Sequence, residues 1–222
     1  KQELYSKIRI KSKDLRKSPK QQIKIRGIKI DDNILSGNFI YPPETKPQKR
    51  FFGVIDYQIS NQQFLKPKSI NLQYIYGTNQ TNSLTSNLQL TANLTQHYNK
   101  SMDAIQFRFF AGYHFLNNIN NQYCFYLRGI QGSTDYLYDY TFLGRQITNY
   151  NNILSHQNTN TYGGFKVNNY EGKSDDWLIA SNLKIELPKM PFGLFGDVGF
   201  YNEEFINANT NEKTIENQFL YN

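Results

Sequence analysis

The feature of this sequence that most restricts its fold is the alternation of apolar and polar residues with a period of two. The alternation is unbroken between residues 87 and 95, where the apolar members are Leu88, Leu90, Ala92 and Leu94. Successive side chains on a β-strand point to opposite faces of the sheet. This segment therefore has the pattern of a strand with one apolar face and one polar face.

The same period recurs along most of the chain. It is visible in segments 51–59, 70–76, 105–115, 123–127, 177–187 and 194–201, and less regularly in 23–30, with a bulge at Gly27, and in 35–41. No segment combines the 3.6-residue period of an amphipathic helix with capping residues. The sequence therefore predicts a single all-β domain over residues 1–222, with about eight to eleven antiparallel strands and little helix.

Several of the predicted strands are long. Segments 86–97 and 104–115 alternate for about the ten residues that a tilted membrane-spanning strand needs, whereas strands in soluble proteins average about five or six. The connections at 61–63 and 117–121 are short, and the loop at 131–176 is long. This combination predicts an antiparallel transmembrane β-barrel, with a soluble β-sandwich as the alternative.

The barrel prediction fixes which way the side chains of segment 87–95 face. In a barrel with a polar interior, the apolar residues point to lipid and the polar ones point inward. The residues expected to face inward are Asn87, Gln89, Thr91 and Asn93.

The composition agrees with an ordered β-protein. Aromatic residues make up 15% of the chain although its mean hydropathy is −0.67. Disordered chains are poor in aromatic residues, so the polarity does not indicate disorder. No apolar run approaches the ~20 residues of a membrane-spanning helix.

Positive charge is concentrated in the basic N-terminal strands of residues 1–50. Fourteen Lys and Arg stand against five acids there, a balance of +9, and the remaining residues come to −2. Such a segment can bind nucleic acid or an anionic membrane surface. These lysines alternate with apolar residues, however, which favours a solvated strand face, and we expect no nucleic-acid partner.

No pattern indicates a catalytic or metal centre. The three histidines are far apart, and the sequence contains no HExxH, GxSxG or phosphate-binding loop. The single cysteine, Cys124, excludes an internal disulfide and a cysteine-built zinc site. His114 lies on the polar side of its segment, where we expect it to face a wet interior. The sequence predicts no cofactor and no catalysis within this chain.

Two local sequences carry more information. One is the run Asp135 to Arg145 in the long loop, which ends Phe-Leu-Gly-Arg and is followed by Gly163-Gly164-Phe165-Lys166. The other is an F-x-D-x-G motif, formed by Phe195, Asp197 and Gly199. Together they resemble the surface-antigen barrels of the BamA and two-partner-secretion superfamily. The resemblance implies a sixteen-stranded barrel in which an arginine of an inward-folded loop meets the aspartate of the F-x-D-x-G strand. The matching residues are Arg145 and Asp197. Gly144 precedes the arginine here, at the position where the superfamily's loop motif usually has valine or isoleucine.

The closest resemblance is to the C-terminal region of large outer-membrane proteins of the Bacteroidota type, in which a gluzincin metallopeptidase-like domain precedes a BamA-like barrel. It covers residues 35–205 and implies that this chain supplies the middle and later strands. The expected function is anchoring of a larger protein in the bacterial outer membrane. The expected partners are lipid and the strands or chains that complete the barrel. A surface receptor or adhesin, and an outer-membrane assembly or secretion barrel, are the alternatives.

Overall fold

The computed structural model describes residues 1–10, 19–35, 45–61, 63, 65–79, 83–98, 103–117, 123–129, 135–139, 161–166, 172–188, 190, 192–206 and 213–221. The strands in these residues are β1 (Gln2–Ile10), β2 (Lys20–Leu35), β3 (Thr45–Asn61), β4 (Lys68–Asn79), β5 (Leu84–His97), β6 (Ala104–Asn117), β7 (Phe125–Tyr126), β8 (Lys173–Ser174), β9 (Trp177–Glu186), β10 (Gly193–Ile206) and β11 (Lys213–Tyr221). No helix in these residues is long and apolar enough to cross a membrane.

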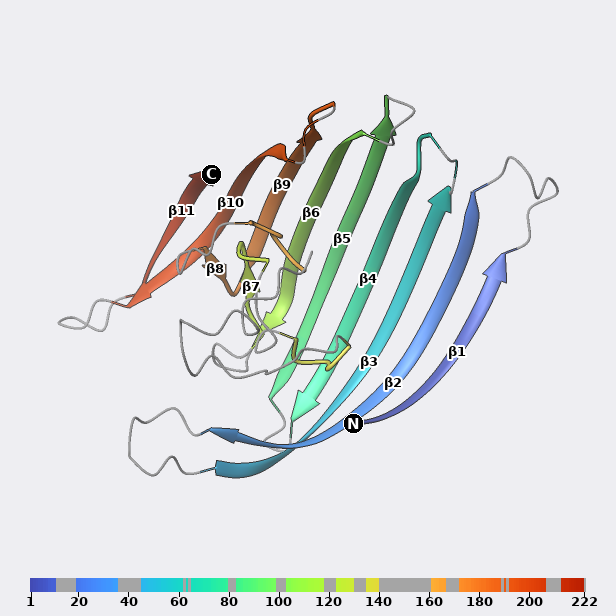
Figure 1. Ribbon diagram of the computed structural model, residues 1–222. Helices are drawn as coiled ribbons and strands as arrows, with labels where there is room; N and C mark the ends of the chain where they lie inside the picture. Colours follow the sequence, from blue (N-terminus) through green and yellow to red (C-terminus); the bar gives the residue numbers. More distant parts are fainter. Residues whose placement is uncertain are drawn as a thin grey trace.

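Nine of the strands form one antiparallel sheet, in the order β1-β2-β3-β4-β5-β6-β9-β10-β11. The sheet is curved and open, with β1 and β11 at its two edges (Figure 1). The predicted all-β antiparallel fold is therefore confirmed. Within the described residues β1 pairs with β2 and β11 pairs with β10, so the sheet does not close on itself.

Three details of the predicted strands are wrong. The register passes through Gly27 without a shift, and the irregularity in the sheet lies between Ser86 and Asn87 instead. Segment 123–127 contributes only the two-residue strand β7, which pairs with β8 and not with the main sheet. Edge strand β11 was not predicted, and β1 was not delimited within the basic N-terminal strands of residues 1–50. The predicted strand at 35–41 lies, beyond Leu35, outside the described residues.

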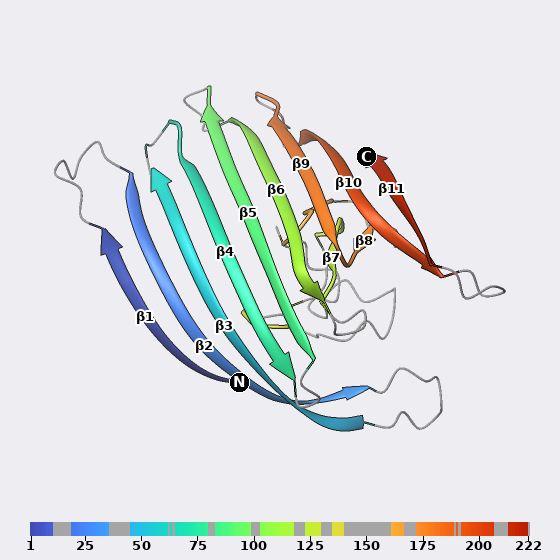
Figure 2. The same cartoon turned by 180° about the vertical axis from the view of Figure 1, so that it is seen from behind.

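The convex face of the sheet is covered by exposed apolar side chains. Seen from behind in Figure 2, no described segment crosses this face. Its exposed large apolar residues include Ile25, Phe51, Ile55, Ile70, Leu72, Tyr74, Tyr76, Leu94, Ile105, Phe107, Tyr113, Phe115, Ile179, Leu183, Leu194, Val198, Phe200, Phe219 and Tyr221. Most of these residues stand at alternate positions of their strands, as the period of two predicts.

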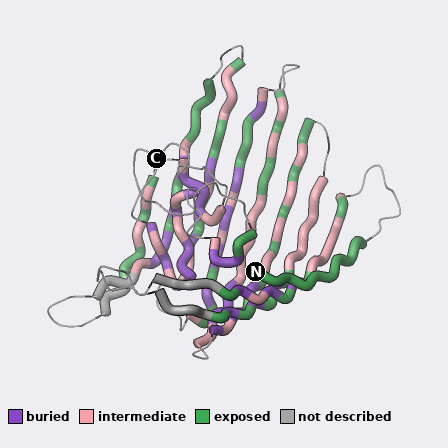
Figure 3. Tube along the Cα trace, turned by 60° about the horizontal axis from the view of Figure 1, so that its bottom comes forward, coloured by how far each residue is buried: buried purple, intermediate pink, exposed green. Residues whose placement is uncertain are grey.

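The concave face carries the core. One buried cluster joins β2, β3 and β4 to Tyr123, Tyr136 and Leu137, and a second joins β6, β9 and β10 to Phe125, Leu127 and Phe165. Figure 3 shows that buried residues gather around the segments that cross this face. The core is thus formed between the sheet and its own long connection.

The crossing segments form a small layer of their own. Segment 123–129 lies in the middle: the Leu127 amide donates to the Gly172 carbonyl (2.7 Å), and the Phe165 amide donates to the Leu127 carbonyl (2.9 Å). Residues 161–166 and 172–174 therefore flank it on either side. We call segments 123–129, 135–139, 161–166 and 172–174 the interior segments.

The apolar and polar residues of segment 87–95 lie on opposite faces of the sheet, as predicted, with the polar ones on the concave face. Gln89 and Thr91 line a cavity on the concave face, and the Asn87 amide donates to the Tyr136 hydroxyl (3.4 Å) of an interior segment. Leu94, on the other face, is 47% exposed.

We predict that the two faces respond differently to truncation of a phenylalanine. Phe110 on the concave face of β6 is 1% exposed, and Phe107 on the convex face of the same strand is 39% exposed. Phe110→Ala leaves a cavity in the core and should lower the free energy of unfolding by about 3–5 kcal/mol. Phe107→Ala should cost less than half of that. Chemical denaturation followed by tryptophan fluorescence measures both, and equal losses would contradict this account of the core.

Candidate functional site

Asp197 is the most deeply buried acid that the structure describes, with an exposure of 1%. One carboxylate oxygen accepts a hydrogen bond from the backbone amide of Lys166 (2.8 Å), and the other accepts one from Nδ2 of Asn182 (2.9 Å). Asn182 lies directly opposite Asp197 in the register of β9 and β10. Because a buried charge needs donors, these two bonds connect interior segment 161–166 to the wall of the sheet.

Asn182 also connects Asp197 to an arginine two strands away. Nη1 of Arg108 donates to Oδ1 of Asn182 (3.0 Å), and Nη2 donates to the Tyr162 carbonyl (2.6 Å). The Asn182 amide nitrogen donates its other hydrogen to the Gly163 carbonyl (2.9 Å). Arg108, Asn182 and Asp197 thus form a guanidinium–amide–carboxylate chain across β6, β9 and β10, which we call the first anchor.

Glycine is required where the interior segment meets this anchor. Gly164 has φ +66°, and a Cβ there would lie 2.8 Å from Nη1 of Arg108. A Cβ on Gly163 would lie 2.5 Å from the backbone of Leu127, and one on Gly199 would collide with the Leu127 side chain. These glycines let two backbones and a charged side chain approach closely.

A second anchor holds interior segment 135–139 to the opposite side of the sheet. Nη1 of Arg26, on β2, lies 2.8 and 2.7 Å from the two carboxylate oxygens of Asp139, and Lys1 Nζ lies 2.8 Å from the first of them. Nε of Arg26 is 3.2 Å from Asp56 on β3. Arg26 is buried, with a side-chain exposure of 6%, so this group of charges is only partly screened by water.

The ionisation of Asp139 follows from these contacts. Burial alone would raise the pKa of its carboxyl group, but the hydrogen bonds from Arg26 and Lys1 outweigh burial and hold the pKa below its ordinary value of 3.8. The Asp139 carboxyl group is therefore ionised at neutral pH.

The structure brings together four of the residues singled out in the sequence. Asp197, Gly199, Gly163 and Gly164 all meet at the first anchor. Phe195 does not take part, because its side chain is 50% exposed. Arg145 and Gly144 lie outside the described residues, so the expected contact between Arg145 and Asp197 stays a prediction.

Sequence reasoning missed Arg26, Arg108, Asn182 and Asp139. The available signal was an arginine on the polar side of a long alternating strand, because such a charge needs a partner once the interior is filled. The partners themselves could not be read from the sequence, since Arg26 and Asp139 are 113 residues apart.

The other two residues considered in the sequence are buried. His114 does not face a wet interior: it is 5% exposed and stacks on Phe125, with ring centroids 4.3 Å apart. Burial raises the pKa of the Cys124 thiol to about 11, as expected of an unreactive cysteine. No group of three or more metal-ligating side chains occurs in the part of the chain that the structure describes.

Comparisons of this chain with models of known protein families, with curated proteins and with solved structures find no match.

We predict that the first anchor controls the order of segment 161–166. Asp197→Ala removes the acceptor of the Lys166 amide, and an unsatisfied buried group costs about 1–3 kcal/mol. Hydrogen exchange of that amide should accelerate by about 5- to 150-fold. Asp31→Ala is the control, because Asp31 is half exposed and forms its ion pair with Lys29 of its own strand, away from segment 161–166. Unchanged protection in Asp197→Ala would contradict the anchoring role.

We predict that the second anchor weakens only in strong acid. A carboxyl group with a lowered pKa stabilises the fold fully above its unfolded pKa, and this contribution is lost as pH falls through the folded pKa. The ¹³C carboxyl resonance of Asp139 should therefore titrate below pH 3.8. Arg26→Gln removes the main donor and should move the midpoint upward. A midpoint that is the same in both proteins would show that Arg26 does not hold this carboxylate.

Proposed function

We propose that this chain is a membrane-embedded section of an antiparallel β-barrel of the BamA-like kind in the bacterial outer membrane. In this proposal it anchors a larger, peptidase-like protein and performs no catalysis within these residues. The partners of its convex face are lipids, and the partners of its two edges are further strands or chains.

The observation that carries the proposal is an uninterrupted apolar row across the convex face. Residues that pair directly in the register of the nine strands are Ile8, Ile23, Tyr57, Leu72, Leu90, Ala111, Ile179, Phe200 and Phe219. Every one of them is aliphatic or aromatic. Contiguous exposed apolar surface is rare on soluble monomers and marks contact with a membrane or a partner.

Strand length supports the same proposal. β4, β5 and β6 contain 12, 14 and 14 residues, and the average strand of a soluble protein has about five or six. A tilted strand needs about 9–11 residues to cross the hydrocarbon layer.

The number of strands in the sheet determines whether an odd or an even number of further strands is needed to close it. Neighbouring strands are antiparallel throughout, so in a nine-stranded sheet β1 and β11 run in the same direction, as their arrows do in Figure 1. An antiparallel closure therefore requires an odd number of additional strands. That requirement agrees with the even-numbered, sixteen-stranded barrel that the resemblance implies. Open strand edges do not occur in lipid, because each unsatisfied backbone group there costs several kcal/mol.

We predict that a charge on the apolar row is tolerated far less well than one on the concave face. Leu72→Lys places an ammonium group on the lipid side and should lower stability by about 2–4 kcal/mol. Asn93→Lys, on the concave face of the adjacent strand, should change stability by less than about 0.5 kcal/mol.

The measurement is urea unfolding of the natural protein and of the two variants, each inserted in phosphatidylcholine vesicles. A Leu72→Lys protein that is as stable as Asn93→Lys, or that stays soluble and monomeric without detergent, would show that the convex face does not contact lipid.

A further inference from the structure

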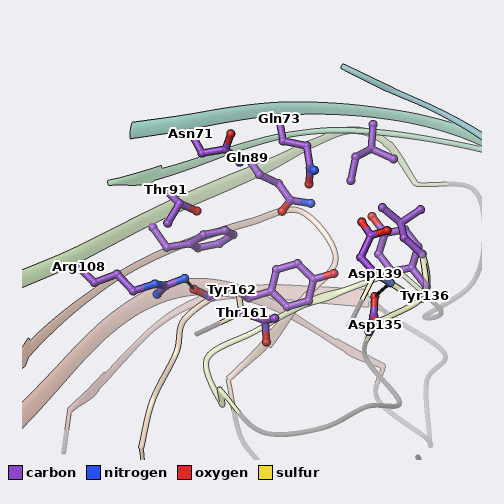
Figure 4. Close-up of a pocket in the computed structure, with 13 residues that line it drawn as sticks. Asn71, Gln73, Gln89, Thr91, Arg108, Asp135, Tyr136, Asp139, Thr161 and Tyr162 are labelled. Atoms are coloured by element: carbon purple, nitrogen blue, oxygen red, sulfur yellow. Dashed lines mark hydrogen bonds between the residues drawn. The ribbon is translucent and has the colours of Figure 1, made fainter. Parts of the chain in front are cut away.

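A cavity of about 130 Å³ lies on the concave face between the two anchors. Its floor is formed by β4 and β5, and it is covered by Tyr136, Asp139 and Tyr162 of the interior segments (Figure 4). The cavity therefore lies between the sheet and the interior segments that the two anchors join to it.

The floor is a regular array of uncharged polar side chains. Asn71 on β4 lies directly opposite Thr91 on β5, and Gln73 lies directly opposite Gln89. All four point into the space beneath the interior segments (Figure 4). Alternate residues of two neighbouring strands thus present three amides and one hydroxyl on one patch.

Part of this array has no partner within the described residues. The Gln73 amide nitrogen donates to Asp56, and that of Gln89 donates to Oδ1 of Asn87 (2.9 Å), so each glutamine keeps an amide oxygen as an acceptor. Asn71 and Thr91 make no side-chain hydrogen bond in the part of the chain that the structure describes. They offer both donors and acceptors to a ligand.

The charges around the cavity are already engaged. Arg108 donates to Asn182 and to the Tyr162 carbonyl, and Asp139 accepts from Arg26 and Lys1. Asp135 accepts from the Asp139 backbone amide (3.0 Å). An ionic ligand would have to compete with these anchors, and breaking a buried ion pair is costly. Aromatic rings complete the wall: Phe110 and Tyr162 pack edge to face, with centroids 5.9 Å apart.

We propose that this cavity binds one unit of an uncharged saccharide. Sugar hydroxyls both donate and accept, as the Asn71 amide and the Thr91 hydroxyl require, and the C–H faces of a sugar ring are apolar surfaces that pack against aromatic side chains. Apolar walls with a few convergent polar groups are typical of small-molecule sites.

The remainder of a longer saccharide has a place to lie. A second hollow of about 640 Å³ shares Asn71, Gln73 and Thr91 with the cavity and continues along β2 to β5, where its uncharged lining residues are Gln22, Gln58, Ser69 and Asn93. Its charged lining residues, Lys1, Glu3, Lys24, Arg26, Asp56 and Asp139, form ion pairs with one another. An oligosaccharide that enters the cavity with its end unit can therefore extend along this polar trough.

The test is isothermal titration of the detergent-solubilised protein with maltotriose, cellotriose and N,N′,N″-triacetylchitotriose, and with a sulfated trisaccharide as the charged comparison. We expect at least one neutral trisaccharide to bind, and the sulfated one to bind at least tenfold more weakly. Thr91→Val and Asn71→Leu each remove hydrogen bonds at nearly constant volume and should weaken binding by about 3- to 10-fold. Thr95→Val, on the same strand but away from the cavity, should bind as the natural protein does.

The proposal is overturned if none of the neutral trisaccharides binds at millimolar concentration. It is equally overturned if the sulfated one binds as well, or if Thr91→Val and Asn71→Leu bind unchanged. The result is independent of the proposed membrane location, because these variants leave the apolar row untouched. Loss of saccharide binding with unchanged vesicle insertion separates the two proposals.

Discussion

Burial of the Asp197 charge is the constraint on which the arrangement of the interior depends. A carboxylate inside a wall of the sheet needs donors, and only one of its two comes from the neighbouring strand, through Asn182. The other is the Lys166 amide, which belongs to the long connection. Satisfying this charge therefore fixes segment 161–166 against the sheet. Segment 126–129 is hydrogen-bonded to segment 161–166, and Gly172 of segment 172–174 is hydrogen-bonded to Leu127. The positions of both segments therefore follow from the same contact.

The main sheet could be predicted because the information for it is local. A period of two over ten or more residues specifies both an extended backbone and the direction of each side chain, and β4, β5, β6, β9 and β10 all show it. Asp197 and Gly199 were singled out in a different way, because the F-x-D-x-G motif resembles that of BamA-like barrels. The residues alone did not indicate that Asp197 meets another part of the chain.

What could not be predicted is where a strand of the correct period is placed. Segment 123–127 alternates as regularly as β6, yet its residues Tyr123, Phe125 and Leu127 are buried between the main sheet and the other interior segments. Alternation gives the direction of each side chain but not the sheet to which a segment belongs. The bounds of edge strand β1 were missed because Ser6 interrupts the apolar side of the strand, which carries Leu4, Ile8 and Ile10. The pairing of Arg26 with Asp139 could not be predicted from the sequence for a different reason. It joins residues that only the folded connection brings together.

One register row across the concave face explains why the cavity forms where it does. The row runs through Arg9, Gln22, Gln58, Asn71, Thr91, Phe110, Ala180, Gly199 and Leu220. It is polar from β1 to β5 and apolar from β6 to β11. The apolar half packs against the interior segments, where Gly199 gives room to Leu127. The polar half cannot be covered in the same way, because uncovered amides keep their hydrogen bonds to water. In this row the cavity lies where the polar half meets the apolar half, at Asn71, Thr91 and Phe110, beneath interior segments that pack on the sheet at other rows on either side.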